Sequence, residues 1–217
     1  IEKVFSAGSI EVFIDELCAI WRGDRYFQSE AHHMTLEGEE LTVIISMPIP
    51  ETEEEFRNIP LSILDITERK KAEQALSYQA THDSLTGLIN RADFERRLVR
   101  VLETVRVSHH EHALCYMDLD QFKVINDTCG HMAGDELLRQ LAQLLSGVIR
   151  KRDTLARLGG DEFGVLMEHC TIEQASRVAG KILDAVSEFR FVWEEQVFRI
   201  GVSIGLVSID QTSENLT

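Results

Sequence analysis

Hydrophobic and polar residues alternate with two periods in the first third of the chain. Between residues 9 and 21 the apolar positions recur every three or four residues, which predicts an amphipathic helix that ends at Gly23. Three strand-like runs follow, at 25–36, 41–49 and 55–66. This pattern predicts a helix and an antiparallel meander. Because so small a sheet buries little apolar surface, we expect further strands to precede residue 1.

The next segment, 65–83, is polar and contains neither Gly nor Pro. Ala72, Leu76 and Ala80 recur in it at four-residue intervals, which predicts an exposed helix with a narrow apolar seam. Two interpretations stay open, a solvated connector and a dimerising coiled-coil segment, because fewer than three heptads are present.

The remaining chain alternates helices and strands more regularly. Apolar spacing predicts three helices, over about 94–105, 137–148 and 171–186. The last begins with the capping box "TIEQ". Strand-like runs lie at 113–117, 154–158, 163–167, 189–193 and 197–209. We expect the last two runs to form one hairpin. The order predicts an α/β sandwich with an antiparallel component.

Composition and charge narrow the class of protein. A hydrophobic content of 44% over 217 residues is ordinary for a globular chain of one large or two small domains. The net charge of −15 offers no basic field, so we expect no nucleic-acid partner. No apolar run is long enough to span a membrane, and we expect a cytoplasmic fragment of a longer protein. Four widely spaced cysteines indicate reduced, structural thiols.

Two acidic sites mark candidate chemistry. A buried strand run leads directly into Asp118 and Asp120, whose side chains share a face because they lie two residues apart. In "RLGGDEFGVL", Asp161 and Glu162 follow glycines that let a phosphate approach the backbone closely. Alone, each site also fits a strand end or a plain hairpin turn. Together they indicate a shared Mg²⁺ and metal-assisted phosphoryl chemistry.

Four colinear motifs carry a resemblance to a known family. They are "THDSLTGLINR", "DLDQFKVINDTCGHMAGDELL", "RLGGDEFGVL" and "VSIGLV", within about residues 81–209. This region resembles the GGDEF family of diguanylate cyclases. The preceding helix and three strands, with "DIT" leading into a helix, resemble the C-terminal half of a PAS sensor domain.

The resemblance implies an α+β fold with a palm-like, nucleotide-cyclase-like α/β sandwich around a mostly antiparallel sheet. It implies a partial PAS-like α+β domain at 1–67, a signalling helix at 68–82 and a cyclase domain at 83–217. The implied reaction belongs to bacterial second-messenger signalling. In a homodimer, the 3′-hydroxyl of each GTP attacks the α-phosphate of the other, which gives cyclic di-GMP and two pyrophosphates.

Residue roles are implied by position in the family. Asp118, the Leu119 carbonyl and Asp161 would bind Mg²⁺, with Mn²⁺ as a substitute. The catalytic residues would be Asp161, Glu162 and Lys123. Either of the two adjacent acids would accept the hydroxyl proton, and Glu162 would alternatively belong to a second metal half-site. Metal coordination would lower the pKa of the hydroxyl and stabilise charge on the phosphorane.

Further positions match substrate contacts of the family. They are Gln121, Phe122, Asn126, His131, Asp135, Gly159 and Gly160. The amide of Asn126 and the carboxylate of Asp135 would read the guanine, and the backbone at Gln121 and Phe122 would meet the phosphates with Lys123. Simpler interpretations stay open: a turn at Asn126, a packed loop histidine at His131 and a solvated lysine.

The pattern "RKRD" gives an Arg150-x-x-Asp153 site. In the family this is an inhibitory site for the product cyclic di-GMP, with a basic residue at the position of Lys181. A solvated loop between a helix and a strand is the alternative.

The chain departs from the family pattern in two places. Ile89 replaces a usual Pro, and the chain stops at Thr217, before the closing helix with its phosphate-binding Lys and Arg. Whether this fragment turns over GTP therefore stays open. One alternative function is a regulatory GGDEF domain that binds GTP or cyclic di-GMP and tunes a downstream phosphodiesterase domain. Another is a PAS interaction module with a passive remnant.

Histidines form two further groups. His109, His110 and His112 could indicate a metal cluster, but we expect a solvated loop because no spaced Cys or carboxylate accompanies them. His32 and His33 would point to opposite faces of a strand.

Overall fold

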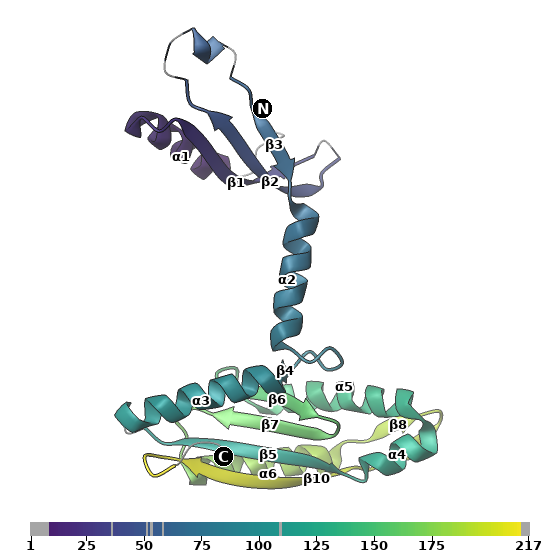
Figure 1. Ribbon diagram of the computed structural model, residues 1–217. Helices are drawn as coiled ribbons and strands as arrows, with labels where there is room; N and C mark the ends of the chain where they lie inside the picture. The colour runs from purple at the N-terminus through teal and green to yellow at the C-terminus, as the bar shows by residue number, and fades with distance from the viewer. Residues whose placement is uncertain are drawn as a thin grey trace. The chain divides into compact units, whose positions relative to one another are not determined.

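The chain forms two compact units, Ile1–Ser77 and Tyr78–Thr217. The computed structural model describes residues 9–213 except 36, 51, 53, 58 and 109. Figure 1 gives the order of the elements along the chain. None of the helices in these ranges is long and apolar enough to cross a membrane.

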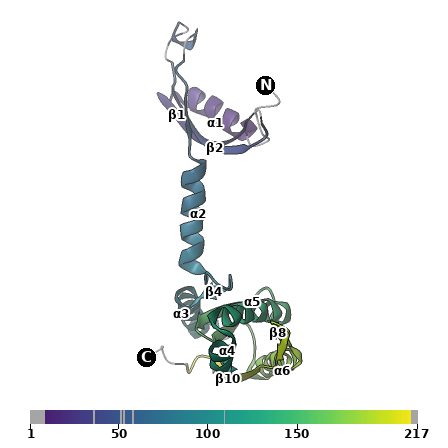
Figure 2. The same ribbon diagram turned by 90° about the vertical axis from the view of Figure 1, so that its right-hand side faces the viewer.

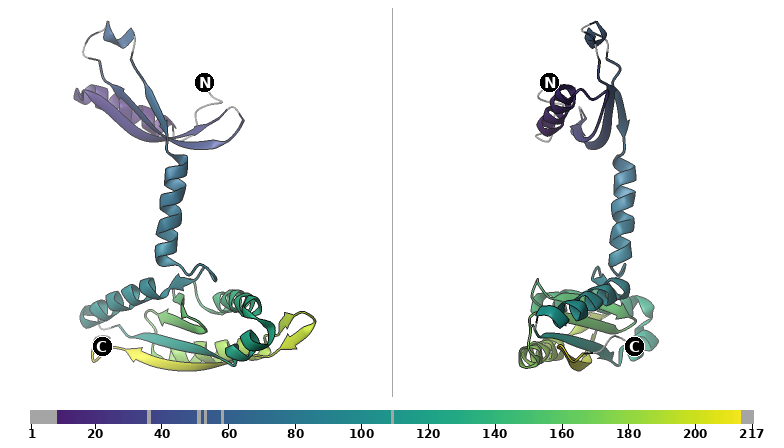
Figure 3. Two further views of the ribbon diagram at one scale, coloured as in Figure 1. Left: turned by 45° about the vertical axis from the view of Figure 1, so that its right-hand side comes forward. Right: turned by 60° about the vertical axis from the view of Figure 1, so that its left-hand side comes forward.

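The first unit is a helix against a small antiparallel sheet (Figure 3). Its elements are α1 (Ser9–Arg22), β1 (Tyr26–Met34), β2 (Glu40–Pro48), the 3₁₀ helix η1 (Glu55–Arg57) and β3 (Ser62–Asp65). The strands pair in the order β1-β2-β3, both pairs antiparallel, so the predicted meander is confirmed. A small core of Ala19, Phe27, Met47 and Ile49 lies between helix and sheet.

One sequence prediction for this unit is wrong. The run 55–66 is a strand only over Ser62–Asp65. Pro60 stands just before it, and a proline cannot donate a ladder hydrogen bond. The predicted amphipathic helix is confirmed as α1, although Ile14, Leu17 and Trp21 are 52%, 50% and 91% exposed.

The helix α2 (Thr67–Thr81) begins where Asp65 Oδ1 accepts a 2.8 Å hydrogen bond from the Thr67 N–H. None of its residues is buried, and the seam residues Ala72, Leu76 and Ala80 are all exposed. The predicted exposed helix is therefore confirmed, and both interpretations of its seam stay open.

The second unit contains a five-stranded sheet with the strand order β10-β5-β7-β6-β4. Its strands are β4 (Ile89–Asn90), β5 (His112–Asp120), β6 (Thr154–Gly159), β7 (Glu162–Met167) and β10 (Gly201–Ile209). Its helices are α3 (Arg91–Ser108), α4 (Phe122–Cys129), α5 (His131–Val148) and α6 (Ile172–Glu188). Only the β4–β6 pair of this sheet is parallel. The predicted α+β class with a mostly antiparallel sheet is confirmed.

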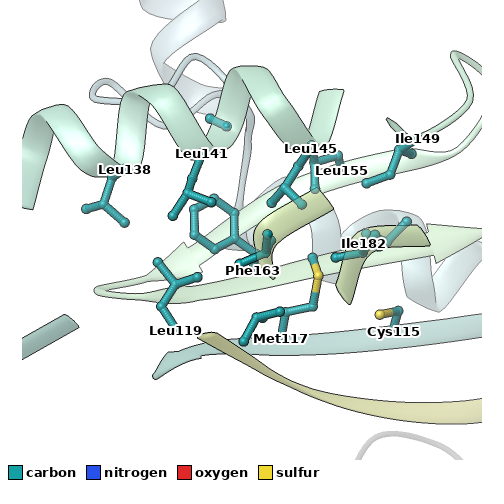
Figure 4. Packing of buried hydrophobic residues seen from close by; sticks show 14 of the residues in the cluster. Cys115, Met117, Leu119, Leu138, Leu141, Leu145, Ile149, Leu155, Phe163 and Ile182 are labelled. Carbon is teal, nitrogen blue, oxygen red and sulfur yellow. The ribbon is translucent and has the colours of Figure 1, made fainter. Parts of the chain in front are cut away.

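Helices cover the two faces of this sheet unequally (Figure 2). On one face, α5 and α6 pack over the odd-numbered residues of β5, which are nearly solvent-free. Phe163 of β7 lies at the centre of that core, between Leu141 and Leu145 of α5 and Met117 of β5 (Figure 4). The other face is covered by α3 through a smaller cluster that includes Leu98 and Val105. The even-numbered residues of β5, including Asp118, point to this second face.

The predicted C-terminal hairpin is not continuous. A separate two-stranded sheet, β8 (Phe191–Trp193) with β9 (Gln196–Phe198), precedes β10, which pairs with β5 instead. This small hairpin lies at the same end of the unit as α4 (Figure 3). The predicted alternation is nevertheless present, because Ile200 and Val202 are both buried. The chain changes sheets at Arg199–Ile200, which a period-two pattern does not reveal.

Candidate functional site

The two acidic sites of the sequence meet where the neighbouring interior strands β5 and β7 pair, at the end of β5 and the start of β7. Asp118 pairs in register with Glu162 of β7, and the Leu119 N–H donates a 3.3 Å hydrogen bond to the Asp161 carbonyl. This backbone bond joins the end of β5 to the tip of the β6–β7 hairpin. The structure therefore brings Asp118, Leu119, Asp161 and Glu162 together.

The hairpin tip requires glycine for conformational reasons. Gly159 has φ 148° and Gly160 has φ 51°, and the ladder shifts register between Arg157 and Gly159. A Cβ atom built on either glycine meets nothing within 4 Å. Backbone conformation, and not lack of space, therefore selects glycine here. The open space leaves the peptide groups of the tip accessible to a ligand.

The side chain of Arg157 binds the tip of the β6–β7 hairpin and links it to Asp83. Its Nε and Nη2 donate to the Gly160 carbonyl at 3.0 and 2.9 Å, and its Nη1 lies 3.2 Å from both carboxylate oxygens of Asp83. The two side chains are only 13% and 22% exposed. Asp83 also accepts from the N–H and hydroxyl of Thr86 at 2.9 and 2.7 Å. The motifs that contain Arg157 and Asp83 did not reveal this ion pair, because the two residues lie far apart in the sequence.

The carboxylates of the site repel one another. Burial, followed by the charges of Asp161, Glu162 and Asp120, raises the pKa of Asp118. Asp120 is turned to the neighbouring strand, where the Ser203 hydroxyl donates to its Oδ1 at 2.8 Å. A divalent cation would relieve the crowding at Asp118, and hard carboxylate and carbonyl oxygens suit Mg²⁺ or Mn²⁺. The described residues contain no cluster of three or more His, Cys, Asp or Glu side chains suited to a metal ion. The residues predicted as ligands are two carboxylates and one carbonyl, so they fit a cation that keeps other ligands.

Glu162 has contacts that the sequence did not predict. The interaction of the Tyr116 hydroxyl with the Glu162 carboxylate, followed by burial, raises the pKa of the phenol to about 12. The guanidinium of Arg91 lies near enough to interact electrostatically with Glu162. Arg91 and Tyr116 also line an open groove of about 800 Å³ between α3 and the sheet.

A short helix begins directly beyond the carboxylates. Gln121, with φ 63°, precedes α4, whose first residues are Phe122 and Lys123. The first amides of a helix are free to bind anions, because they have no intrahelical acceptor. The alternative of a turn at Asn126 is excluded, because Asn126 lies within α4, where it is half-buried. The start of α4 could not be predicted from the sequence, because Gln121 in a left-handed conformation replaces the usual side-chain cap.

Gly130 joins α4 to α5 at the opposite end of the short helix. It has φ 86°, and its N–H donates to the Asn126 carbonyl at 2.9 Å. His131 and Asp135 lie on the first turns of α5, and both are exposed. The α4–Gly130–α5 segment thus carries Asn126, His131 and Asp135 on two packed helices.

The "RKRD" pattern forms a closed turn. The Asp153 N–H donates to the Arg150 carbonyl at 3.0 Å, and Arg150 is exposed. The Asp153 side chain is buried, which raises its pKa, and its Oδ1 has no hydrogen-bond partner among the described residues. The Arg152 Nε is 3.9 Å from that oxygen, which is too long for a hydrogen bond. Lys181 is exposed on α6, and no hydrogen bond or ion pair of the described chain joins it to Arg150 or Asp153.

The prediction of a solvated histidine loop is wrong for His112. His109 lies outside the described residues. His112 is part of β5 and only 2% exposed, and its Nδ1 accepts a 3.3 Å hydrogen bond from the His169 N–H. Burial, together with the neighbouring His169, lowers the pKa of His112. The ring of His169 also contacts that of exposed His110, at a centroid distance of 4.7 Å. His112 pairs in register with Ile209 of β10, and it is buried although its local sequence is polar.

Comparisons with known proteins agree on the second unit. The family model "Diguanylate cyclase, GGDEF domain" matches residues 80–217. The probable diguanylate cyclase DgcE of Escherichia coli K12 is 50% identical over 153 residues, which are 70% of this chain and 14% of DgcE. The cyclic di-GMP phosphodiesterase PdeB of Shewanella oneidensis is 34% identical over 154 residues, 71% of this chain and 18% of PdeB.

Solved structures give the same result. The coiled coil and GGDEF domain of DgcB from Caulobacter crescentus, crystallised with cyclic di-GMP, matches with a TM-score of 0.63 and 25% identity. That match covers 68% of this chain and 79% of the DgcB chain. The chain thus spans less than a fifth of the length of DgcE and of PdeB. It spans most of the crystallised DgcB chain.

Proposed function

The chain belongs to the GGDEF family of diguanylate cyclases, and we propose that its second unit condenses two GTP into cyclic di-GMP with release of pyrophosphate. The observation that carries this proposal is the backbone bond from Leu119 to Asp161, which unites the two acidic motifs in one site.

Asp118, the Leu119 carbonyl and Asp161 are the proposed ligands of Mg²⁺, with Mn²⁺ as a substitute. The crowded charges that raise the pKa of Asp118 support a cation at this place. When bound, the ion would acidify the attacking hydroxyl and stabilise negative charge at the α-phosphate. Glu162 or Asp161 would accept the hydroxyl proton. Glu162 pairs in register with Asp118 and interacts with the Tyr116 hydroxyl, which supports Glu162 in this role.

The phosphates would be bound at the start of α4. The amides at Gln121 and Phe122, and the side chain of Lys123, lie at the positive end of the helix dipole. The peptides of Gly159 and Gly160 would meet the phosphates from the hairpin, where the backbone is unobstructed.

The guanine would be read from the α4–α5 segment. Asn126 offers an amide and Asp135 a carboxylate, which match the acceptor and donor edges of the base, and His131 would line the site. The short connection through Gly130 supports a common orientation of the two readers.

Each half-reaction joins two nucleotides, so the proposed enzyme is a homodimer in which two second units face each other. The exposed seam of α2 supports a role in dimerisation. We further propose that residues 1–67 form a PAS-like sensor, that 68–82 form the signalling helix, and that 83–217 form the catalytic domain. The three-stranded sheet of the first unit supports this division. Specific activity should fall on dilution into the monomeric range, and unchanged specific activity would contradict the dimer.

The product would inhibit through Arg150 and Asp153, with support from Lys181. In this turn Arg150 is exposed and one Asp153 oxygen has no hydrogen-bond partner among the described residues. Both observations support binding of cyclic di-GMP, whose phosphate would meet Arg150 and whose guanine would meet Asp153. Arg150→Ala should raise the inhibition constant for cyclic di-GMP. An unchanged constant would contradict product feedback at this turn.

A second candidate function is regulatory binding. In this case the domain would bind GTP or cyclic di-GMP and tune a phosphodiesterase domain outside this chain. The 34% identity with a cyclic di-GMP phosphodiesterase favours this candidate, whereas the presence of Asp118, Asp161 and Glu162 favours catalysis.

One experiment separates the two functions. A chain extended past Thr217 is incubated with GTP and Mg²⁺, and cyclic di-GMP is measured by chromatography, with Asp161→Ala as the control. Catalysis predicts product from the extended chain and at least about a thousandfold less from the variant, because a metal ligand is lost. Nucleotide binding without product would contradict catalysis and favour regulation.

A further inference from the structure

Gly134 of α5 directly faces the side chain of Asn126 on α4. A Cβ atom at position 134 would overlap Asn126 Oδ1, and it would lie 3.0 Å from Asn126 Cγ and 3.2 Å from Phe122 Cζ. Gly134 is buried and lies in the first turn of a regular helix, with no positive φ. Steric space, and not backbone conformation, therefore requires glycine at this position.

The backbone around this contact cannot yield easily. The Gly130 N–H donates to the Asn126 carbonyl at 2.9 Å, and the Ala133 and Gly134 N–H groups both point to the Gly130 carbonyl, at 3.1 and 3.4 Å. One residue therefore fixes the end of α4 and the start of α5 together. An added methyl at position 134 would have to be accommodated by rotation of the Asn126 side chain.

A second glycine of the same helix provides the contrast. Gly147 is exposed, and a Cβ atom there would meet nothing within 4 Å. Glycine is a poor residue for a helix interior, so alanine is the better residue at both positions by helix propensity alone. Only at Gly134 does a neighbouring side chain oppose the replacement.

We propose that Gly134 is a positioning residue that sets guanine specificity. Its missing side chain leaves a notch in α5, and the notch holds the Asn126 amide in the orientation that meets the base beside Asp135. This inference rests on the proposed function, because it assumes that Asn126 reads guanine.

The test measures nucleotide binding by the full chain. The ligand is 3′-deoxy-GTP with Mg²⁺, which lacks the attacking hydroxyl and cannot be converted, and its dissociation constant is measured by calorimetry. Gly134→Ala should weaken binding roughly tenfold, the effect of about one lost hydrogen bond to the base. The matched control Gly147→Ala should bind as the unmodified chain does. The affinity ratio of 3′-deoxy-GTP over 3′-deoxy-ATP should fall for Gly134→Ala only.

A double-mutant cycle with Asn126→Ala shows whether Gly134 acts through Asn126. In the Asn126→Ala chain the notch is empty, so adding Gly134→Ala should neither weaken binding further nor lower the melting temperature. An equal loss from Gly134→Ala in both backgrounds would overturn the inference, as would unchanged binding by Gly134→Ala.

The cycle also separates this inference from the proposed function. If Asn126→Ala weakens binding and Gly134→Ala does not, only the role of Gly134 fails. If Asn126→Ala binds 3′-deoxy-GTP as the unmodified chain does, base reading by Asn126 fails, and the inference is overturned with it. Because the double variant has room for the added methyl, the comparison holds even where Gly134→Ala alone melts early.

Discussion

The two faces of the five-stranded sheet differ in what their side chains do. On the α5/α6 face, Phe163, Met117 and their neighbours are fully buried in one continuous core. On the α3 face, the same strands carry Tyr116, which lines an open groove, and the paired carboxylates Asp118 and Glu162. Because strand residues alternate between faces, a single strand such as β5 supplies both.

This difference separates stability from chemistry within a few residues of sequence. Leu119 anchors the core, while its neighbours Asp118 and Asp120 project to the polar face. Substitutions on the covered face should therefore mainly change the free energy of unfolding. Substitutions of Tyr116, Asp118 or Glu162 on the α3 face should mainly change activity.

The largest expected effect on stability is at Phe163. Phe163→Ala should lower the free energy of unfolding by about 3–5 kcal/mol, because it leaves a cavity at the centre of the core. Leu158→Ala is the matched control, since Leu158 lies in the same hairpin and lines the groove on the α3 face. Urea titration of both variants gives the comparison. Equal losses would contradict the difference between the two faces.

The next effect is expected at Arg157. Arg157→Gln removes the donors that hold the Gly160 carbonyl and the ion pair with Asp83. We expect product formation to fall about 10- to 100-fold, because a misplaced hairpin tip misplaces Asp161. Arg96→Gln, which removes the ion pair between the exposed Arg96 side chain and the buried Asp93, should leave the rate unchanged. Initial rates at saturating GTP measure this, and a normal rate for Arg157→Gln would show that the tip needs no support.

A smaller effect is expected at Asp83, on the loss of folding stability at acid pH. Burial acts to raise the pKa of Asp83, but hydrogen bonds from Thr86 and Arg157 outweigh it and hold this pKa below its usual range. The stability that Asp83 contributes is therefore present above its unfolded pKa of about 3.9, and it is lost as the pH falls through the folded value. Asp83→Asn should flatten the melting temperature between about pH 5 and pH 3. An unchanged acid slope would contradict the role of this pair.

The smallest effect is expected at Asp118. Its pKa is raised by burial and by neighbouring carboxylates, so the ionised group destabilises the metal-free fold as the pH rises through the folded value. Asp118→Asn should raise the melting temperature in the presence of EDTA by a few degrees at most. This gain should shrink at low pH, where Asp118 itself is protonated. A lower melting temperature at pH 7 would contradict the repulsion.

The sequence predicted the elements whose apolar residues repeat over several turns. The helix at 171–186 has a strong period and a local capping signal, and Thr171 accepts from the Gln174 N–H as expected. The strands of the sheet were found for the same reason. By contrast, β4 has two residues and α4 has eight, too few for a period to appear.

Contacts distant in sequence could not be predicted from periodicity. Arg157 meets Asp83 across 74 positions, and Ser203 meets Asp120 across 83. The apolar spacing at 9–21 predicted helix α1 correctly, but spacing alone does not show that Ile14 and Trp21 are exposed. The motifs therefore located Asp118 and Asp161, while their supporting residues required the fold.

Gly160 at the tip of the β6–β7 hairpin and Gly134 of α5 would respond differently to a D-amino acid. Gly160 adopts a left-handed φ of 51°, which is strained for most L-residues, yet the space around it is open. A D-alanine introduced there by semisynthesis would adopt this φ without strain, and it would stiffen the tip, whereas L-alanine would not. At Gly134 the two enantiomers are not alternatives of this kind, because the obstacle is a neighbouring atom. Measuring product formation for D- and L-alanine at position 160 would show the difference, and equal rates would contradict it.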